Sequence, residues 1–136
     1  MTKKAAEILA RKYEADLEEI KDLTNRKGVA GYLRAGRDAI RKKLTEIEET
    51  KYNPANYDLV LVGTPIWGWN MSVPIRTYLV ENRGKFKKVA FFCTMSGSGD
   101  KQAFEEMEKI TKKKPIKTWT FLTAAVARGE LKEYKF

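Results

Sequence analysis

A chain of 136 residues, 43% of them hydrophobic, is long enough for one domain with a core of its own. The chain has no histidine and a single cysteine, Cys93, which excludes an internal disulfide, a Cys-x-x-Cys redox pair and nucleophilic catalysis through a histidine base. Redox or hydrolytic chemistry would therefore have to come from a cofactor. No apolar run approaches a membrane span, and residues 1–4 lead into an amphipathic segment rather than a signal-peptide core, so we expect a cytoplasmic protein with no membrane partner.

The chain is basic, with 27 Lys and Arg against 18 Asp and Glu and a net charge of +9. The two signs are mixed along most of its length, which is typical of a solvated surface. Arg34, Arg37 and Arg41 form a one-signed helical stripe with Lys42 and Lys43 beside it, and such a stripe could instead bind a polyanion. Because no nucleic-acid-binding motif accompanies the stripe, we favour the surface interpretation over a nucleic-acid partner.

The pattern of apolar residues in the first part of the chain predicts two helices separated by a short strand. Residues 3–13 show helical spacing, whereas residues 15–20 alternate imperfectly and carry the charges of an edge strand. A polar turn follows at residues 22–28, and residues 48–56 predict a loop. Between them a second amphipathic helix is predicted at residues 29–47. Its apolar stripe consists of Val29, Tyr32, Leu33, Gly36, Ile40, Leu44 and Ile47.

Residues 59–62 form a short apolar run without alternation, which indicates a strand buried on both faces of a parallel sheet. This strand leads into a loop that contains two tryptophans. A helix is predicted to start at Ser72, because Pro74 in its first turn loses no hydrogen bond, and to end at Asn82. In open α/β sheets the loop after a strand is also where ligands bind.

The remaining elements continue the alternation of strands and helices. Residues 88–94 predict a second buried strand, Asp100 is a good N-cap for a helix that continues to residue 112, and residues 116–125 predict a third strand. The order predicts an α/β fold, a mostly parallel sheet with helices on both faces joined by right-handed crossovers. With no repeat or linker, residues 1–136 are expected to form a single domain.

Two stretches resemble the flavodoxin-like proteins. Val-Gly-Thr-Pro-Ile-Trp-Gly-Trp-Asn-Met-Ser-Val-Pro-Ile-Arg-Thr-Tyr-Leu at residues 62–79 is similar to the loop and helix after the third strand of that family. Phe-Phe-Cys-Thr-Met-Ser-Gly-Ser-Gly at residues 91–99 is similar to its next strand and glycine-rich loop, and residues 2–8 look like the helix that follows its phosphate-binding loop. The resemblance implies a three-layer flavodoxin-like sandwich, truncated at both ends because the first strand with its phosphate loop and the last helix are absent.

The resemblance also implies an FMN site with the flavin ring held between loops 64–70 and 94–99. The implied cofactor-binding residues are Thr64, Pro65, Ile66, Trp67, Gly68, Trp69, Thr94, Met95, Ser96, Gly97, Ser98 and Gly99. Tryptophans offer flat faces for stacking, although one of them could instead cap the sheet and the other fill an oligomer interface. Glycines let backbone N–H groups approach the ring. Cys93 lies inside a strand and is expected to be a packed, inert thiol.

The missing family elements imply two further expectations. Loss of the phosphate loop should weaken FMN binding or abolish it, because several charge-assisted hydrogen bonds are lost. Without the central strand, either the segment around Leu17 pairs directly with residues 59–62, or the exposed strand edge pairs with another copy in a homodimer or higher oligomer.

The function implied is that of an FMN-binding electron-transfer protein or a flavin-dependent reductase. Neither needs a side chain as acid or base, and the sequence names no redox partner. One alternative is an oligomeric flavodoxin-like protein that no longer binds flavin. The other is a basic module that binds polyanions through Arg34, Arg37 and Arg41.

Overall fold

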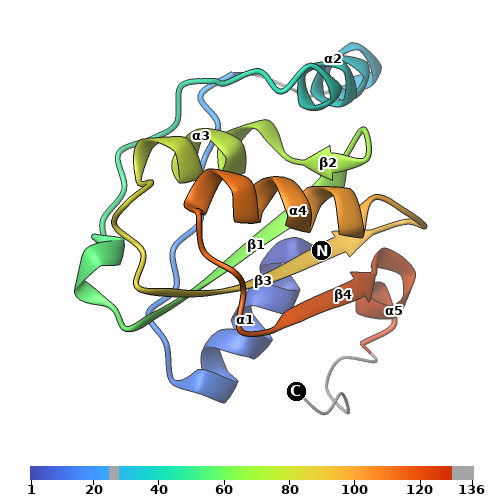
Figure 1. Cartoon of the computed structure of the whole chain (residues 1–136). Coiled ribbons are helices and arrows are strands. Elements are labelled where there is room, and N and C mark those ends of the chain that lie inside the picture. The colour runs from blue at the N-terminus through green and yellow to red at the C-terminus, as the bar shows by residue number, and fades with distance from the viewer. Residues whose placement is uncertain (25–27, 130–136) are drawn as a thin grey trace.

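The computed structural model describes residues 1–24 and 28–129, which contain a four-stranded sheet with helices on both faces (Figure 1). The strands are β1 (Leu59–Trp67), β2 (Asn70–Met71), β3 (Lys88–Met95) and β4 (Thr118–Leu122). Their order is β2-β1-β3-β4, in which β1, β3 and β4 run parallel and β2 pairs antiparallel with the end of β1. The mostly parallel α/β sheet predicted from the sequence is therefore confirmed.

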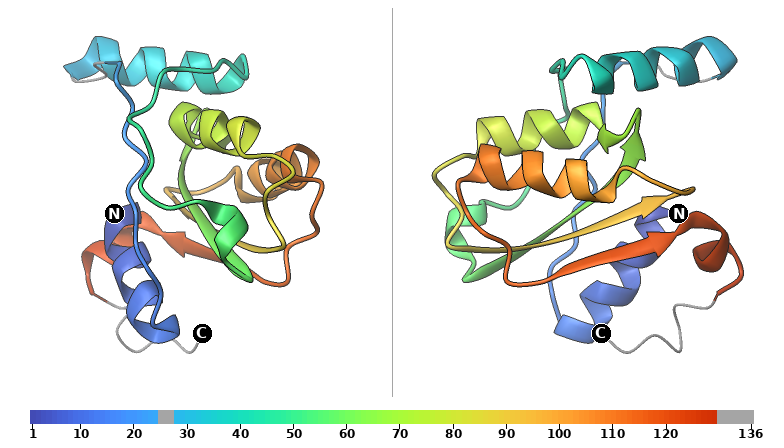
Figure 2. Two further views of the ribbon diagram at one scale, coloured as in Figure 1. Left: turned by 90° about the vertical axis from the view of Figure 1, so that its left-hand side faces the viewer. Right: turned by 45° about the vertical axis from the view of Figure 1, so that its right-hand side comes forward.

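The helices form layers on either side of this sheet (Figure 2). The helical elements are α1 (Thr2–Tyr13), α2 (Gly28–Ile40), a 3-10 turn η1 (Pro54–Asn56), α3 (Val73–Glu81), α4 (Asp100–Thr111) and α5 (Thr123–Ala127). α3 and α4 cover one face and α1 covers the other. α2 lies outside these layers, beyond α3 and beside β2. α2 therefore lies over the region around β2 and the start of α4.

Burial on both faces explains why β3 has no polar alternation. Val89 and Phe91 pack in one apolar cluster with α3 and α4, whereas Ala90 and Phe92 pack in a second cluster with α1. Alternate residues of one strand thus serve two cores, as expected for a parallel strand between helical layers. Gly63 on β1 makes room for this packing, because a Cβ atom added there would lie 2.0 Å from Phe92 Cζ.

The predicted edge strand at residues 15–20 is wrong. This segment is extended but pairs with no strand in the described residues, so the predicted direct pairing of the Leu17 segment with β1 is absent. Its carboxylates explain the difference. Glu18 accepts hydrogen bonds from the backbone N–H groups of Lys51 and Tyr52, and the Tyr57 hydroxyl donates to Asp16 at 2.5 Å. Side-chain contacts to the 51–57 loop therefore replace a strand ladder.

The predicted helix at residues 29–47 is too long, and most of its apolar stripe is exposed. α2 ends at Ile40 because Lys42 adopts a left-handed conformation and the N–H of Lys43 donates to the Asp38 carbonyl. The residues of α2 that are buried are small or polar: Gly31, Ala35, Asp38 and Ala39. The large ones, among them Val29, Tyr32 and Leu33, are exposed. The stripe thus lies outside the core that it was expected to enter.

Three smaller corrections concern loop ends. The strand predicted at residues 116–125 is shorter and ends at Leu122, where α5 begins. Gly99 is the N-cap of α4, and Asp100 lies in its first turn, where its carboxylate accepts a hydrogen bond from the Thr120 hydroxyl at 3.0 Å. The predicted loop after residue 62 is strand as far as Trp67. Residues 25–27 of the predicted polar turn and residues 130–136 lie outside the described residues.

Candidate functional site

The loops that follow β1 and β3 touch at the carboxyl edge of the sheet. The contact is at Gly99, where an added Cβ atom would lie 2.8 Å from Ile66 Cγ2 and 2.8 Å from the Cα atom of Trp69. Gly99 has a φ of +110°, which glycine adopts without strain. A side chain at this position would force the two loops apart, so glycine permits their approach.

The loop after β1 is a two-residue hairpin turn into β2. Trp67 pairs with Asn70, so Gly68 and Trp69 are the central residues, with φ angles of +54° and +61°. Positive φ at both positions is the requirement of a type I′ hairpin turn. Glycine meets it freely, whereas an L-residue such as Trp69 loses roughly 1–2 kcal/mol in this conformation. The turn holds Trp69 at its tip, 59% exposed.

Hydrogen bonds of threonine hydroxyls tie the ends of β1 and β3 to the neighbouring helices. The Thr64 hydroxyl accepts from the Ser72 N–H at 2.9 Å and donates to the Pro65 carbonyl at 2.7 Å, which ties the end of β1 to the start of α3. The hydroxyl oxygens of Thr2 and Thr94 lie 2.6 Å apart, which places the first turn of α1 beside the end of β3. The N-terminus of α1 therefore reaches the same edge of the sheet as the two loops.

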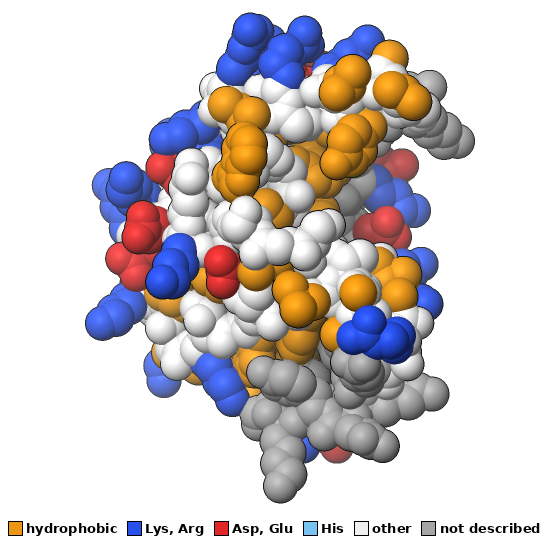
Figure 3. Space-filling model, turned by 90° about the vertical axis from the view of Figure 1, so that its right-hand side faces the viewer, with side chains coloured by type: hydrophobic (Ala, Val, Ile, Leu, Met, Phe, Trp, Pro, Cys, Tyr) orange, Lys and Arg blue, Asp and Glu red, His pale blue; other side chains and the backbone are white. Residues whose placement is uncertain are grey.

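A cleft of about 900 Å³ opens between these loops and α2. Figure 3 looks onto this side of the molecule, where hydrophobic side chains gather around the hollow in the upper half, below a row of Lys and Arg side chains. The lining residues are Gly28, Tyr32, Leu33, Ala35, Gly36, Arg37, Ile40, Arg41, Ile66, Trp67, Gly68, Trp69, Ser96, Gly97 and Ser98. The structure thus brings residues 66–69 and 96–98 of the two predicted loops together around one space.

The other predicted site residues lie behind this lining. Thr64 and Thr94 are buried, at 0% and 3% exposure, and act through the hydrogen bonds described above. Pro65, Met95 and Gly99 are partly buried and do not line the cleft. A direct contact of these residues with a ligand stays a prediction.

The side of the cleft formed by α2 was not predicted. Tyr32, Leu33, Arg37, Ile40 and Arg41 all line it. Two patterns in the sequence include these residues, the basic stripe and the apolar stripe. Neither pattern predicts that the helix lies over loops that are distant in the sequence. The charge pattern favours a solvated surface for the first stripe, and the second indicates only an amphipathic helix.

Among the described residues, two arginines and no Asp or Glu line the cleft. Cys93 lies behind the loops in β3, buried, and burial raises the pKa of its thiol to about 11. Its burial confirms that the thiol is packed. That it is inert stays a prediction, which the raised pKa favours because a protonated thiol is a poor nucleophile.

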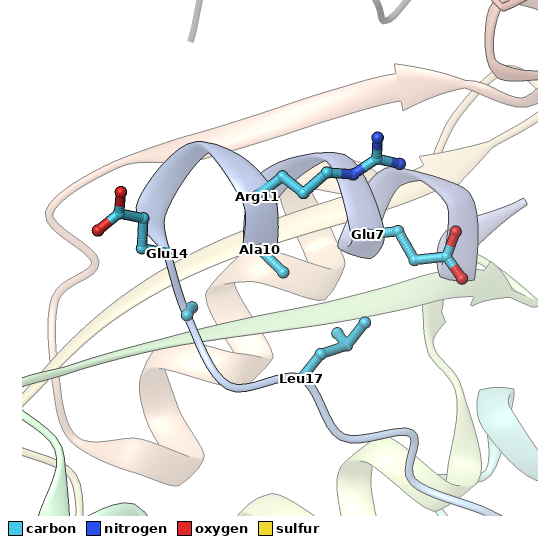
Figure 4. Close-up of a pocket in the computed structure, with 6 residues that line it drawn as sticks. Glu7, Ala10, Arg11, Glu14 and Leu17 are labelled. Carbon is cyan, nitrogen blue, oxygen red and sulfur yellow. The ribbon is translucent and has the colours of Figure 1, made fainter.

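A second hollow, of about 590 Å³, lies between α1 and the segment that follows it (Figure 4). Ala10 and Leu17 face each other across it, and the charged side chains of Glu7, Arg11 and Glu14 stand around its rim. Within the described part of the chain, no helix is long and apolar enough to cross a membrane, and no cluster of three or more His, Cys, Asp or Glu side chains could hold a metal ion.

A mostly parallel α/β sheet with two loops that meet at its carboxyl edge is typical of the class of open-sheet α/β proteins. A family model described as flavodoxin matches residues 1–135, and the chain belongs to this family. The fold is accordingly flavodoxin-like. No curated protein matches the chain.

Three solved structures are similar to the chain over most of their length. A flavoprotein from Lactobacillus acidophilus NCFM, determined in complex with FMN, is 26% identical with a TM-score of 0.71, covering 93% of this chain and 89% of that one. A presumed flavoprotein from Bacteroides eggerthii DSM 20697 has 24% identity and a TM-score of 0.72, covering 97% and 89%. Another from Bacteroides uniformis ATCC 8492 has 20% identity and a TM-score of 0.76, covering 97% and 90%. The last two support the fold alone.

Proposed function

We propose that the protein binds FMN, with the flavin ring between loops 64–70 and 94–99, and that it acts as an electron-transfer protein or a flavin-dependent reductase. The observation that carries this proposal is the meeting of the two loops at Gly99 beside a cleft lined by Trp67 and Trp69. Membership of the flavodoxin family and the FMN complex of the Lactobacillus protein support it. Bound FMN would supply the redox chemistry that this chain's own side chains lack.

Each loop has a distinct role in this proposal. The indoles of Trp67 and Trp69 provide flat apolar surface for stacking on one side of the ring. Gly97 provides close approach on the other side, because open space surrounds the position of a Cβ atom there. Thr64 and Thr94 act indirectly, by holding the loop ends through their hydroxyls.

We propose that the ring supplies most of the binding free energy and that the phosphate adds little. The first turn of α1 would attract a phosphate, as helix N-termini do. The hydroxyl of Thr2 in this turn is engaged with Thr94 rather than directed to a ligand. Each charge-assisted hydrogen bond to a phosphate contributes roughly 1.5–3 kcal/mol of binding free energy, and this contribution is lost where the bond does not form. FMN should therefore bind only slightly more tightly than riboflavin, which has no phosphate.

The test is a titration of the purified protein with FMN and with riboflavin, followed by visible absorption and tryptophan fluorescence. We expect a bound flavin spectrum and quenching of tryptophan emission for both ligands, with dissociation constants within about tenfold of each other. Trp69→Phe should lose part of the quenching, whereas Trp119→Phe, in the core behind α1, should retain the ligand-dependent part. Absence of any spectral change would reject the proposal and favour a flavodoxin-like protein that binds no flavin.

We also propose that the protein self-associates through β1. From Leu59 to Pro65 this strand pairs with β3 on one edge, and no strand among the described residues pairs with its other edge. Free N–H and C=O groups along a strand edge are a template for pairing with another chain. A second copy would satisfy them.

A further inference from the structure

α2 places two cations over the proposed flavin site. Arg37 lies in the last turn of α2, and Arg41 follows one turn later, with its N–H donating to the Arg37 carbonyl at 3.0 Å. Residues four apart on a helix project to the same side. Both arginines line the cleft.

The positive charge of these two residues is only partly compensated. Arg37 lies 3.4 Å from the Asp38 carboxylate, with half of its side chain exposed. Arg41 is exposed and makes no ion pair with a described residue, in contrast to Lys42 and Lys43, whose ammonium groups approach Glu106 and Asp38. No carboxylate of a described residue lines the cleft, so its two arginines favour an anionic occupant.

The other side chains on this side of the cleft favour a flat apolar body for that occupant. Tyr32 and Leu33 face the cleft from α2 while remaining 78% and 64% exposed, which leaves large apolar surface without a partner. The cleft's volume of about 900 Å³ is near the upper end of the range of roughly 300–1,000 Å³ for small-molecule pockets. There is room for a second small molecule beside a flavin ring.

We infer that the cleft binds a flat aromatic anion, an aromatic carboxylate or sulfonate, whose charge is held by Arg37 and Arg41 and whose ring packs against Tyr32 and Leu33. This inference rests on the proposed flavin site, because it assigns the flavin to the loops and the second ligand to α2. It names the class of molecule that meets the flavin. The arginines act as binding residues, and no proton or electron transfer is assigned to them.

A competing assignment would give the two arginines to the FMN phosphate. The position of α1 argues against it. The Thr2–Thr94 contact places the first turn of α1 at the same edge of the sheet, yet α1 does not line the cleft. A flavin with its phosphate towards α1 and its ring between the loops therefore leaves the arginines of α2 for another anion.

The experiment uses the FMN-saturated protein and two matched aromatic probes, naphthalene-2-sulfonate and the neutral 2-naphthol. Binding of each is measured by isothermal titration calorimetry at low and high salt, which requires no turnover. For Arg41→Gln and Arg37→Gln we expect the affinity for naphthalene-2-sulfonate to fall about tenfold, with a weaker salt dependence. The affinity for 2-naphthol should not change. Arg34→Gln removes the same charge from an exposed residue of α2 outside the cleft lining, and it should behave as the unmodified protein.

Titrations with FMN and riboflavin separate the possible failures. If neither the unmodified protein nor any variant binds FMN or riboflavin, the proposed function fails. If Arg41→Gln weakens FMN but not riboflavin, the arginines hold the flavin phosphate and the inference is overturned. It is also overturned if flavins bind normally but naphthalene-2-sulfonate binds no more weakly to Arg41→Gln than to Arg34→Gln.

Discussion

Gly68 and Gly36 bring the backbone of the β1–β2 turn against the backbone of α2. A Cβ atom added to Gly68 would lie 2.6 Å from the Gly36 carbonyl oxygen and 2.6 Å from Ile40 Cγ1. The rest of the α2 contact surface is also made of small residues, among them Gly31, Ala35 and Ala39. This close approach sets the distance between α2 and the loops and thereby fixes the width of the cleft.

Gly68→Ala should therefore displace α2. The new methyl group meets backbone that cannot move aside, and φ at this position is +54°. Gly84→Ala is a matched control, since φ there is +86° but open space surrounds the added Cβ. Gly84→Ala should destabilise by about 1 kcal/mol from φ alone, and Gly68→Ala by about 3 kcal/mol.

Hydrogen exchange distinguishes displacement of α2 from a general loss of stability. Relative to the unmodified protein, Gly68→Ala should accelerate amide exchange more in α2 than in β3, and flavin binding should weaken. In Gly84→Ala the two elements should change together. Equal protection of α2 in both variants would contradict a role for Gly68 in its docking.

The elements that the sequence predicted correctly are those whose pattern is decided locally. Residues 59–62 and 89–93 are short apolar runs without alternation, which favour strands between two layers, and Ser72 with Pro74 indicates the start of α3. The two site loops followed from family resemblance and from the rule that ligands bind beyond the carboxyl ends of strands.

The elements that were missed depend on contacts distant in the sequence. The apolar stripe at residues 29–47 predicts a helix. Which face of α2 is buried depends on the contact of Gly36 with Gly68, more than 30 residues away. The segment at residues 15–20 alternates like a strand, yet Glu18 finds its partners at Lys51 and Tyr52. The turn into β2 places a tryptophan at positive φ, which local preferences disfavour.

Trp69→Asn should separate stability from binding. Asparagine tolerates the left-handed backbone of this turn, and the indole that it removes is exposed, so the free energy of unfolding should stay the same or rise by up to about 1 kcal/mol. Flavin affinity should fall about tenfold through loss of the stacking face. Urea unfolding and flavin titration measure the two effects. Trp69→Phe keeps an aromatic face and the strained backbone, so it should retain more affinity and gain no stability; a large loss of stability in Trp69→Asn would refute the argument.

Glu106 of α4 joins the residues that follow α2 to α3 and gives the fold a defined acid sensitivity. Its carboxylate lies 2.9 Å from Lys42 Nζ and 3.5 Å from Nη1 of Arg76, whose Nε and Nη2 are buried and have no hydrogen-bond partner within the described chain. The hydrogen bond from Lys42 is the main cause that lowers the pKa of Glu106 below its ordinary value of 4.5, and the charges of Arg76 and Lys109 add to it. A lowered carboxyl pKa means that the stabilisation is complete above the unfolded-state value and is lost as pH falls through the folded-state value.

Glu106→Gln should therefore destabilise the protein by roughly 3 kcal/mol at pH 7, because Arg76 is left buried without its counter-charge. The difference from the unmodified protein should shrink as pH falls below about 4. Glu105→Gln changes an exposed carboxylate one residue away, and it should neither destabilise the protein at pH 7 nor give a difference that depends on pH. Urea unfolding between pH 3 and 7 measures this, and a difference that does not depend on pH would exclude Glu106 as the titrating group.

The unpaired edge of β1 predicts that the protein self-associates. Leu59, Val60 and Leu61 are only half-buried, although the equivalent stretch of β3 is almost wholly buried, because β3 has a strand on each side and β1 lacks one from Leu59 to Pro65. Pairing with a second copy would cover this edge and satisfy its free backbone groups. Light scattering at moderate concentration should give a mass of at least twice the 15.6 kDa of one chain, and the β1 amides should exchange faster on dilution. A mass of 15.6 kDa at every concentration would show that the edge is tolerated in water, and self-association would then be rejected without affecting the proposed flavin site.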